Sequence, residues 1–326
     1  MLLTISRTLC SATLAAGLAA TALPAWGQTY PSGPVHLIVA YAAGGTGDVV
    51  ARIVAPKLSM ALGQSVIVEN RAGASGAIGA RSVAAATPDG LTLLIGQTAE
   101  VAINQHWLKG LNYDPDKDLQ PVALLAVVPL ALLVPAKAPY STMAEFLKAL
   151  PNSKLTFASA GTGTPGHFAG ELLKTKTHSN LTHVPYKGAG PALNDLIGGH
   201  VDLYFPGMPA AIPHLKGGLA KVLAVSSAKR SGIAPEVPTV AESAGIQDFD
   251  FTLWAGVFAP RGTAPAIVAR LNSDINKVLN EPDTRQRLVE AGADVEPMSV
   301  DQFRAFVHAE SGKYARIIKE TGESAE

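Results

Sequence analysis

Three short segments rich in glycine and small hydroxyl side chains are the part of this sequence best suited to bind a ligand. They are Ala43-Gly44-Gly45-Thr46-Gly47, Gly73-Ala74-Ser75-Gly76 and Ser159-Ala160-Gly161-Thr162-Gly163-Thr164. Each follows a β-prone run and precedes an apolar pattern with a helical period. Glycine lets the backbone approach a ligand closely, and a helix start offers unpaired N–H groups with a partial positive charge. The three segments therefore predict an anion site, although each segment alone could be a turn that needs glycine only for its geometry.

The third segment also contains the spacing G-x-G-x-x-G, from Gly161 to Gly166, which occurs in dinucleotide sites. A dinucleotide site needs an acidic residue about 20 positions further on, and residues 182–187 contain none. A phosphate-binding P-loop needs lysine where His167 stands. The proline after Thr164 favours a helix start, with Thr164 as its N-cap. We therefore expect a small carboxylate here rather than a nucleotide.

Several side chains and main-chain groups around the three segments are candidate ligand contacts. Asp48 begins the first helix, where it could favour the helix dipole, order the loop, or bind a ligand hydroxyl or ammonium. Tyr41 could pack on the ligand or in the core, and His167 could donate to a carboxylate. Tyr186 and Asp202 are candidates at the rim. The candidate hydroxyl donors are Thr46, Ser75, Thr98, Ser159, Thr162 and Thr164. Main-chain contacts are expected at Gly44, Gly45, Ala74, Gly76, Gly161 and Gly163.

The usual signatures of catalysis and metal binding are missing from the sequence. Ser159 has Phe157 two residues before it and Gly161 two residues after it, so it is not part of a G-x-S-x-G nucleophile elbow. The eight histidines show no HExxH or other metal-ligand spacing. We therefore predict no enzyme, no metal and no cofactor. An exported α/β hydrolase with a spatially assembled site remains the alternative.

The composition fits a folded protein with one large domain or two. The chain has 326 residues, of which 48% are apolar and 16% are charged, enough for sizeable cores. The 26 basic residues balance the 26 acidic ones. Without a basic excess, nucleic acid is not an expected partner.

The first 27 residues have the layout of a secretory signal peptide. Arg7 is their only charged side chain, an apolar stretch runs over residues 9–23, and small residues precede a cut before Gln28. The single cysteine, Cys10, lies in this segment, so the mature protein would be exported to the periplasm without disulfides. The apolar run 122–134 is interrupted by proline and too short to span a bilayer. It predicts two buried strands or one kinked strand, and a protein not embedded in the membrane.

Strand and helix patterns alternate along the rest of the chain. The alternation predicts an α/β fold with mostly parallel sheets flanked by helices, and ligands bind such sheets at the carboxyl ends of strands. Capping boxes at Thr142 and Ser299 predict two helix starts, and Pro282 ends a helix that begins near Thr263. The expected strands cover residues 35–41, 65–68, 91–96, 155–158, 182–185, 201–205, 222–226 and 251–259.

The chain resembles the extracytoplasmic solute-binding receptors of tripartite tricarboxylate transporters. The resemblance covers nearly the whole mature chain, in order. Where the family often has Pro-Gly-Gly in the first loop, this sequence has Ala43-Gly44-Gly45, which leaves the exact ligand open. The matching stretches are GGTGDVVAR (44–52), ENRAGASGAIG (69–79), PDGLTLL (88–94), ASAGTGTPGH (158–167), YKGAGPA (186–192), GHVD (199–202) and WAGVFAP (254–260).

This resemblance implies a two-lobed periplasmic clamshell of the type II binding-protein fold. Lobe one would comprise residues 28–100 and 222–326, and lobe two residues 101–221. A small organic acid, either a di- or tricarboxylate or an aromatic carboxylate, would bind between the lobes. Membrane permease subunits would be the partner of a monomeric receptor. A clamshell sensor for a signalling partner is a further alternative.

Overall fold

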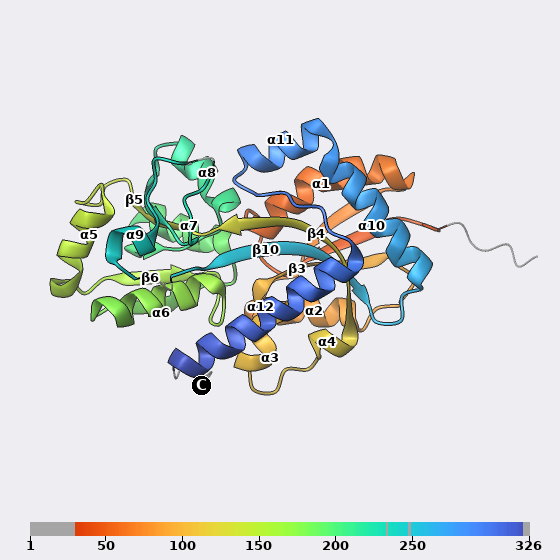
Figure 1. Ribbon diagram of the computed structural model, residues 1–326, viewed down its shortest axis with the longest axis horizontal. Coiled ribbons are helices and arrows are strands. Elements are labelled where there is room, and N and C mark those ends of the chain that lie inside the picture. The colour runs from red at the N-terminus through yellow and green to blue at the C-terminus, as the bar shows by residue number, and fades with distance from the viewer. Residues whose placement is uncertain (1–29, 233, 247–248, 322–326) are drawn as a thin grey trace, which may run out of the picture.

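Two five-stranded sheets lie side by side in the computed structural model (Figure 1). The structure describes residues 30–232, 234–246 and 249–321. The predicted signal peptide, residues 1–27, lies outside them. We call the parts built on the two sheets the first lobe and the second lobe.

The first sheet has the strand order β2-β1-β3-β10-β4, with only β10 antiparallel to its neighbours. Successive residues of β1 point to opposite faces, so Leu37 and Val39 join one core cluster while Ile38 and Ala40 join another. Both faces are therefore covered by helices. The strands are β1 (Val35–Val39), β2 (Val66–Asn70), β3 (Thr92–Gln97), β4 (Leu119–Pro129) and β10 (Thr252–Pro260). The helices are α1 (Thr46–Leu62), α2 (Ala77–Ala84), α10 (Pro265–Asn280) and α11 (Pro282–Glu290).

The second sheet repeats this plan with the order β7-β6-β8-β5-β9, in which only β5 is antiparallel to its neighbours. Four of five strands thus run the same way in each sheet, as the sequence predicted. The strands are β5 (Ala131–Pro135), β6 (Thr156–Ser159), β7 (Thr182–Pro185), β8 (Leu203–Tyr204) and β9 (Ala220–Val225). The helices are α5 (Met143–Ala149), α6 (Pro165–Thr177), α7 (Ala189–Gly198), α8 (Met208–Lys216) and α9 (Val240–Ala244).

The chain passes between the lobes along extended segments. The apolar run 122–134 forms two strands, β4 and β5, which meet at Leu130 and belong to different sheets. Of the two readings of this run, two buried strands is therefore the one observed. Sheet membership also places β4 in the first lobe, whereas the predicted boundaries put it in lobe two. The predicted boundary between residues 221 and 222 falls within β9, which belongs to the second sheet. We therefore propose crossing points near Leu130 and between β9 and β10.

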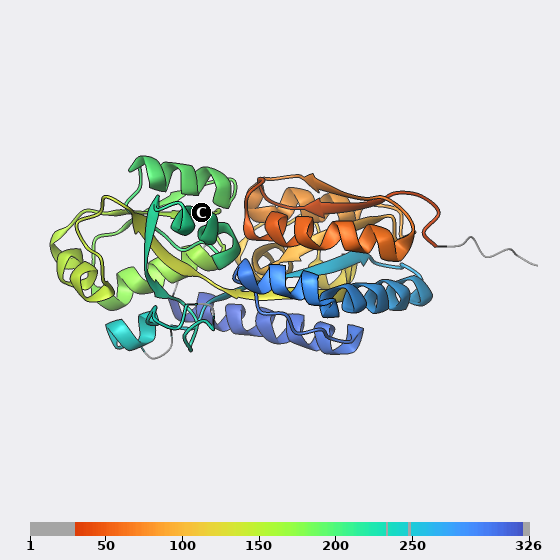
Figure 2. The same ribbon diagram turned by 90° about the horizontal axis from the view of Figure 1, so that it is seen from above.

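The final helix, α12 (Val300–Thr321), runs along both lobes (Figure 2). Its Phe303 is buried in a first-lobe core cluster and its Tyr314 in the second-lobe core. The predicted capping box at its start is present, because the main chains and side chains of Ser299 and Gln302 exchange two hydrogen bonds. The short helices are η1 (Ala74–Gly76), η2 (Ala99–Ile103), α3 (Asn104–Trp107), α4 (Pro115–Asp118) and η3 (Leu150–Asn152). Within the described ranges, no helix is both long and apolar enough to cross a membrane.

Candidate functional site

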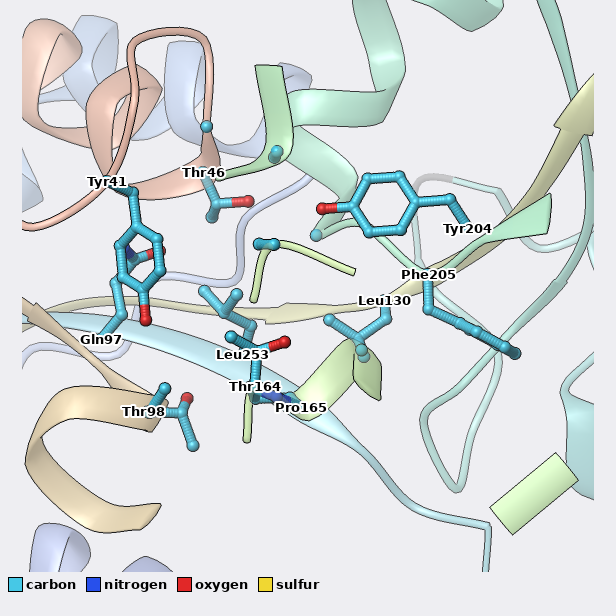
Figure 3. Close-up of a pocket in the computed structure, with 16 residues that line it drawn as sticks. Tyr41, Thr46, Gln97, Thr98, Leu130, Thr164, Pro165, Tyr204, Phe205 and Leu253 are labelled. Atoms are coloured by element: carbon cyan, nitrogen blue, oxygen red, sulfur yellow. The ribbon is translucent and has the colours of Figure 1, made fainter. Parts of the chain in front are cut away.

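A cavity of about 40 Å³ lies between the two lobes (Figure 3). This space holds about three water molecules. Among the described residues, none of those that line the cavity carries a charge. The lining residues are Tyr41, Gly45, Thr46, Gln97, Thr98, Ala99, Leu130, Ala160, Thr164, Pro165, Gly166, Ala189, Tyr204, Phe205, Gly207 and Leu253.

Uncharged polar side chains from both lobes reach this cavity. The hydroxyl of Tyr204, on β8, points across it toward Thr46 and Tyr41 in Figure 3. In the part of the chain that the structure describes, the hydroxyls of Tyr204 and Thr46 and the side-chain amide of Gln97 have no hydrogen-bond partner. Thr98 Oγ1 accepts a hydrogen bond from the main-chain N–H of Trp254 at 3.1 Å, which leaves its own proton to donate. Polar atoms that face a cavity without a protein partner can bind a ligand oxygen or a water molecule.

The first glycine loop is held by Asp48, in the first turn of α1. The carboxylate accepts from the main-chain N–H of Gly44 at 3.0 Å, from Arg52 Nε at 3.0 Å and from Asn70 Nδ2 at 3.0 Å. Burial acts to raise the pKa of Asp48, but these hydrogen bonds outweigh it and hold that pKa below its ordinary value. Of the roles considered for Asp48, ordering the loop is the one its contacts support.

The second glycine loop has a strained backbone. Gly73, Ala74, Ser75 and Gly76 all have positive φ, at 135°, 48°, 49° and 86°. Such conformations are unfavourable for alanine and serine and persist only where the surroundings impose them. The carbonyl of Ser75 accepts from Tyr41 Oη at 3.1 Å and from Asn104 Nδ2 at 2.9 Å. Ser75 Oγ donates across the cleft to the carbonyl of Thr162 at 2.5 Å, so this loop contacts both lobes directly.

Glu100 lies against the second glycine loop, and the sequence analysis did not predict it as part of the site. It is fully buried, and its carboxyl group accepts from the main-chain N–H of Gln97 at 2.7 Å and lies 3.1 Å from Tyr41 Oη. Burial raises the pKa of Glu100 to about 8, although these contacts lower it. The side chain is therefore largely a neutral acid at pH 7.

Two histidines, the buried His167 and the half-buried His183, hold the third glycine loop. His167 Nδ1 accepts from the main-chain N–H of Gly163 at 3.2 Å, and His183 Nε2 lies 2.7 Å from Ser159 Oγ. Ser159 Oγ also accepts from the N–H of Gly161 at 3.1 Å. The two imidazole rings contact each other, with centroids 4.3 Å apart. Burial lowers the pKa of His167 to about 4 and that of His183 to about 3, and the charge of Lys174 adds to both effects. Both rings are neutral at pH 7, and His167 supports the loop instead of facing the cavity.

Thr164 occupies the N-cap position of α6, as predicted, but its side chain does not cap the helix. Its hydroxyl donates to the carbonyl of Gly161 at 2.7 Å. The prediction of a capping hydroxyl was therefore wrong. The hydroxyl closes the glycine loop on itself and faces the cavity.

The predicted site residues fall into three groups. Tyr41, Gly45, Thr46, Thr98 and Thr164 line the cavity of Figure 3. A second, open cavity of about 360 Å³ between the lobes is lined by Tyr41, Ala74, Ser75, Gly76, Gly161, Thr162 and Tyr186, among others. Outside both cavities lie Gly44, Asp48, Ser159, Gly163, His167 and Asp202.

Asp202 lies away from the glycine loops. Its carboxylate accepts from the main-chain N–H of Thr156 at 2.7 Å and from Thr156 Oγ1 at 2.9 Å. Thr156 begins β6, and the glycine loop follows the other end of that strand. We therefore leave Asp202 out of the proposed site. Gln97 and Tyr204 line the cavity and were missed, although both end strands, which is where ligands of α/β sheets gather.

Comparison with known proteins agrees with this arrangement. The family model described as the tripartite tricarboxylate transporter family receptor matches residues 50–323. The chain belongs to this receptor family. Its solved relatives include the periplasmic binding protein BugD, with 32% identity, a TM-score of 0.87, and 91% of this chain and 100% of that chain covered. The likeness confirms the predicted two-lobed type II fold. The family consists of the periplasmic binding proteins of transporters.

Two further relatives in the receptor family were solved with a ligand. One is a Rhodopseudomonas palustris protein with adipate, which is 36% identical with a TM-score of 0.86, over 90% of this chain and 98% of that chain. The other is MatC from the same organism with bound malate, which is 35% identical with a TM-score of 0.82, over 89% of this chain and 100% of that chain. Both ligands are dicarboxylates.

Membership of a solute-binding receptor family rules against the hydrolase alternative. Ser159 and His183 do form a close pair, which is a feature of serine hydrolases. Ser159 is fully buried, however, and lines neither of the two cavities described above. The pair supports the third glycine loop of the receptor. No cluster of three or more metal-ligating side chains occurs within the described ranges.

Proposed function

We propose that this receptor captures a small carboxylate between the two lobes, where the cavity of Figure 3 and the second, open cavity share Tyr41 and Ala160, and delivers it to the membrane subunits of a tripartite tricarboxylate transporter. The observation that carries the proposal is a charge-free cavity between two lobes, with unpartnered polar groups on Thr46, Gln97 and Tyr204. Relatives that hold adipate and malate support the same ligand class. Export by the N-terminal signal and action as a monomer are parts of this proposal.

The site can bind a carboxylate with useful affinity even though, among the described residues, no basic side chain lines the cavity of Figure 3. Each hydrogen bond to a charged group contributes about 1.5–3 kcal/mol, and micromolar affinity corresponds to about 8 kcal/mol. The starts of α1, at Thr46, and α6, at Pro165, both lie at the cavity and add about 0.3–1 kcal/mol each. Hydroxyls and helix starts can together reach that affinity after the losses on binding.

Isosteric variants test the proposed contacts. Thr46→Val removes a hydroxyl that has no protein partner in the described part of the chain, and Thr164→Val removes the hydroxyl that closes the third loop on the Gly161 carbonyl. Both nearly keep the side-chain volume, so adipate or malate should bind each variant about 10- to 100-fold more weakly. Isothermal titration calorimetry measures the change. Thr182→Val is the matched control, because Thr182 is exposed on β7 and lines neither cavity. Equal affinities for all three variants and the parent would place the ligand elsewhere, and no heat from any small organic acid would refute the proposal.

Delivery to a transporter requires a separate experiment in the host cell. Deleting the genes of the membrane subunits should abolish uptake of the bound acid, since the receptor alone cannot cross the membrane with its ligand. A response to the acid that persists without those subunits would favour the sensor alternative.

A further inference from the structure

Three glycines of the second lobe lie directly against the start of the first glycine loop. A Cβ atom on Gly188 would lie 2.9 Å from the main-chain N of Ala42, and one on Gly190 would lie 2.5 Å from the carbonyl oxygen of Ala43. A Cβ on Gly207 would collide with the side chain of Thr46. Real Cβ atoms do not approach other atoms so closely, so these glycines allow the lobes to meet backbone to backbone.

The backbone conformation explains only one of these three glycines. Gly188 has φ of 147°, which side-chain-bearing residues rarely adopt. Gly190 lies within α7 and is not among the residues with positive φ, while Gly207 has φ of −64°. Any residue could adopt the latter two conformations. What excludes a side chain at Gly190 and Gly207 is the other lobe.

The strictest of these contacts is the one at Gly190. Its neighbour is a main-chain oxygen of the first glycine loop, which cannot rotate away, whereas the Thr46 side chain opposite Gly207 can. Ala189, next to Gly190 in the chain, lines the ligand cavity. One short segment therefore supplies a wall of the cavity and the contact that sets how closely the lobes approach.

We propose that Gly190, with Gly188 and Gly207, is the seat on which the first glycine loop rests when the lobes close. These glycines are positioning residues that bring the loop with Gly45 and Thr46 to its closed place. Gly188 and Gly190 line neither cavity, whereas Gly207 also lines the cavity of Figure 3. This gives a role to the YKGAGPA stretch, residues 186–192, that the cavity lining alone does not explain. The importance of this glycine contact for ligand capture rests on the proposed function, but the existence of the contact does not.

A disulfide trap tests the seat without any ligand. A Cβ on Gly45 would lie 3.8 Å from Cβ of Ala189, which is the separation of a normal disulfide. We therefore expect the Gly45→Cys/Ala189→Cys pair, in a chain that also carries Cys10→Ser, to cross-link under mild oxidation. Adding Gly190→Ala should slow the cross-link about tenfold or more, because the closed state becomes less populated. Non-reducing gel electrophoresis measures the rate.

Gly312→Ala is the matched control. Gly312 is also a helical glycine, in α12, but no atom lies within 4 Å of its added Cβ. Both variants replace glycine by a better helix former, so neither should lower the melting temperature of the open protein. Gly312→Ala should leave the cross-linking rate unchanged. Equal rates for Gly190→Ala and the parent pair, or no cross-link in the parent pair, would overturn the seat.

Binding measurements keep this inference apart from the proposed function. In the chain without introduced cysteines, Gly190→Ala should weaken adipate or malate binding about tenfold, while Gly312→Ala should not change it. If neither acid nor any other small carboxylate binds the parent, the proposed function fails, and the cross-linking result still decides whether the seat exists.

Discussion

The two sides of the cleft hold their glycine loops with different chemistry. On the first lobe, carboxyl groups accept the main-chain N–H groups: Asp48 that of Gly44 and Glu100 that of Gln97. On the second lobe, His167 accepts the N–H of Gly163, and His183 pairs with the serine hydroxyl that accepts from Gly161. The comparison shows that a glycine-rich backbone needs buried acceptors, and that either kind of group can supply them.

The difference matters because these acceptors titrate in different pH ranges. The pKa of Asp48 is held below its ordinary value of 3.8, whereas burial lowers the pKa of His167 to about 4 from 6.5. Glu100 shows the opposite shift, to about 8 from 4.5. The two walls of the cleft should therefore respond differently to acid.

The largest expected effect is a loss of stability on mild acidification that comes from the second lobe. Above pH 6.5, His167 is neutral in both the folded and unfolded states. As the pH falls toward 4, the unfolded chain binds a proton that the folded protein does not, so folding stability is lost. The shift of the His167 pKa from 6.5 to about 4 corresponds to about 3 kcal/mol. Chemical denaturation at pH values from 7 to 4 measures it.

His167→Asn isolates this contribution, because an asparagine oxygen can accept from Gly163 and does not titrate in this range. The variant should lose about 3 kcal/mol less than the parent between pH 6.5 and 4. Glu100 contributes a slope of opposite sign and His183 a slope of the same sign, and because both residues are present in both proteins their contributions cancel in the difference. If the free energy of unfolding changes with pH equally in the parent and in His167→Asn, His167 is charged in the folded protein or lies in a different place.

The second prediction concerns the first lobe, where Asp48→Ala should destabilise the protein at every pH above about 4. It removes one buried acceptor from Gly44, Arg52 and Asn70 at once, and we expect a loss of about 2–3 kcal/mol. The stability that Asp48 supplies is complete above its unfolded pKa and is lost as the pH falls through its lowered folded pKa. Asp48→Ala should therefore keep the same pH profile as the parent between pH 6.5 and 5, measured by the same denaturation experiments.

Arg52→Met is the control for Asp48→Ala, because the Arg52 side chain is 53% exposed. Asp48 is buried, but solvent screens the exposed guanidinium, so Arg52→Met should cost less stability than Asp48→Ala. If Arg52→Met lowers the free energy of unfolding as much as Asp48→Ala does, Asp48 stabilises the protein through the ion pair and not through its contact with the loop.

The sequence alone predicted the place of the three glycine loops because local patterns determine it. A β-prone run, a glycine-rich segment and a helical pattern follow each other in the chain, and parallel strands bring their carboxyl ends to one edge. Five predicted residues line the cavity of Figure 3, and their contact with a ligand stays a prediction. The lobe membership of β4 and β9 could not be read locally, because all buried strands share the same apolar composition and long-range pairing decides the sheet.

The supporting groups were missed for a similar reason. His183 lies 24 residues from Ser159 and reaches it only through the parallel pairing of β6 with β7, which sets Phe157 opposite His183. The hydroxyl of Thr164 had two acceptable partners, a helix N–H and the Gly161 carbonyl, and a sequence pattern does not rank them. The need for glycine at position 190 comes from the other lobe, which no pattern within the YKGAGPA stretch reveals.

The smallest expected effect sharpens the comparison within the first lobe, where Glu100 is a carboxyl group that the fold keeps neutral. Its pKa rises from 4.5 to about 8. Between these values the unfolded chain releases a proton that the folded protein retains, so stability falls as the pH rises. Glu100→Gln keeps the shape without a titrating proton, but its new amide N–H group must find a partner at every pH, so the variant should be about 1–3 kcal/mol less stable than the parent near pH 4.5. It should become more stable than the parent by about 1–2 kcal/mol at pH 8, less than the full pKa shift because the new amide N–H group must also find partners. Denaturation at pH 4.5, 6 and 8 gives the difference. A variant less stable than the parent at pH 8 would mean that Glu100 is ionised in the fold and holds the second loop as a charged acceptor, as Asp48 holds the first.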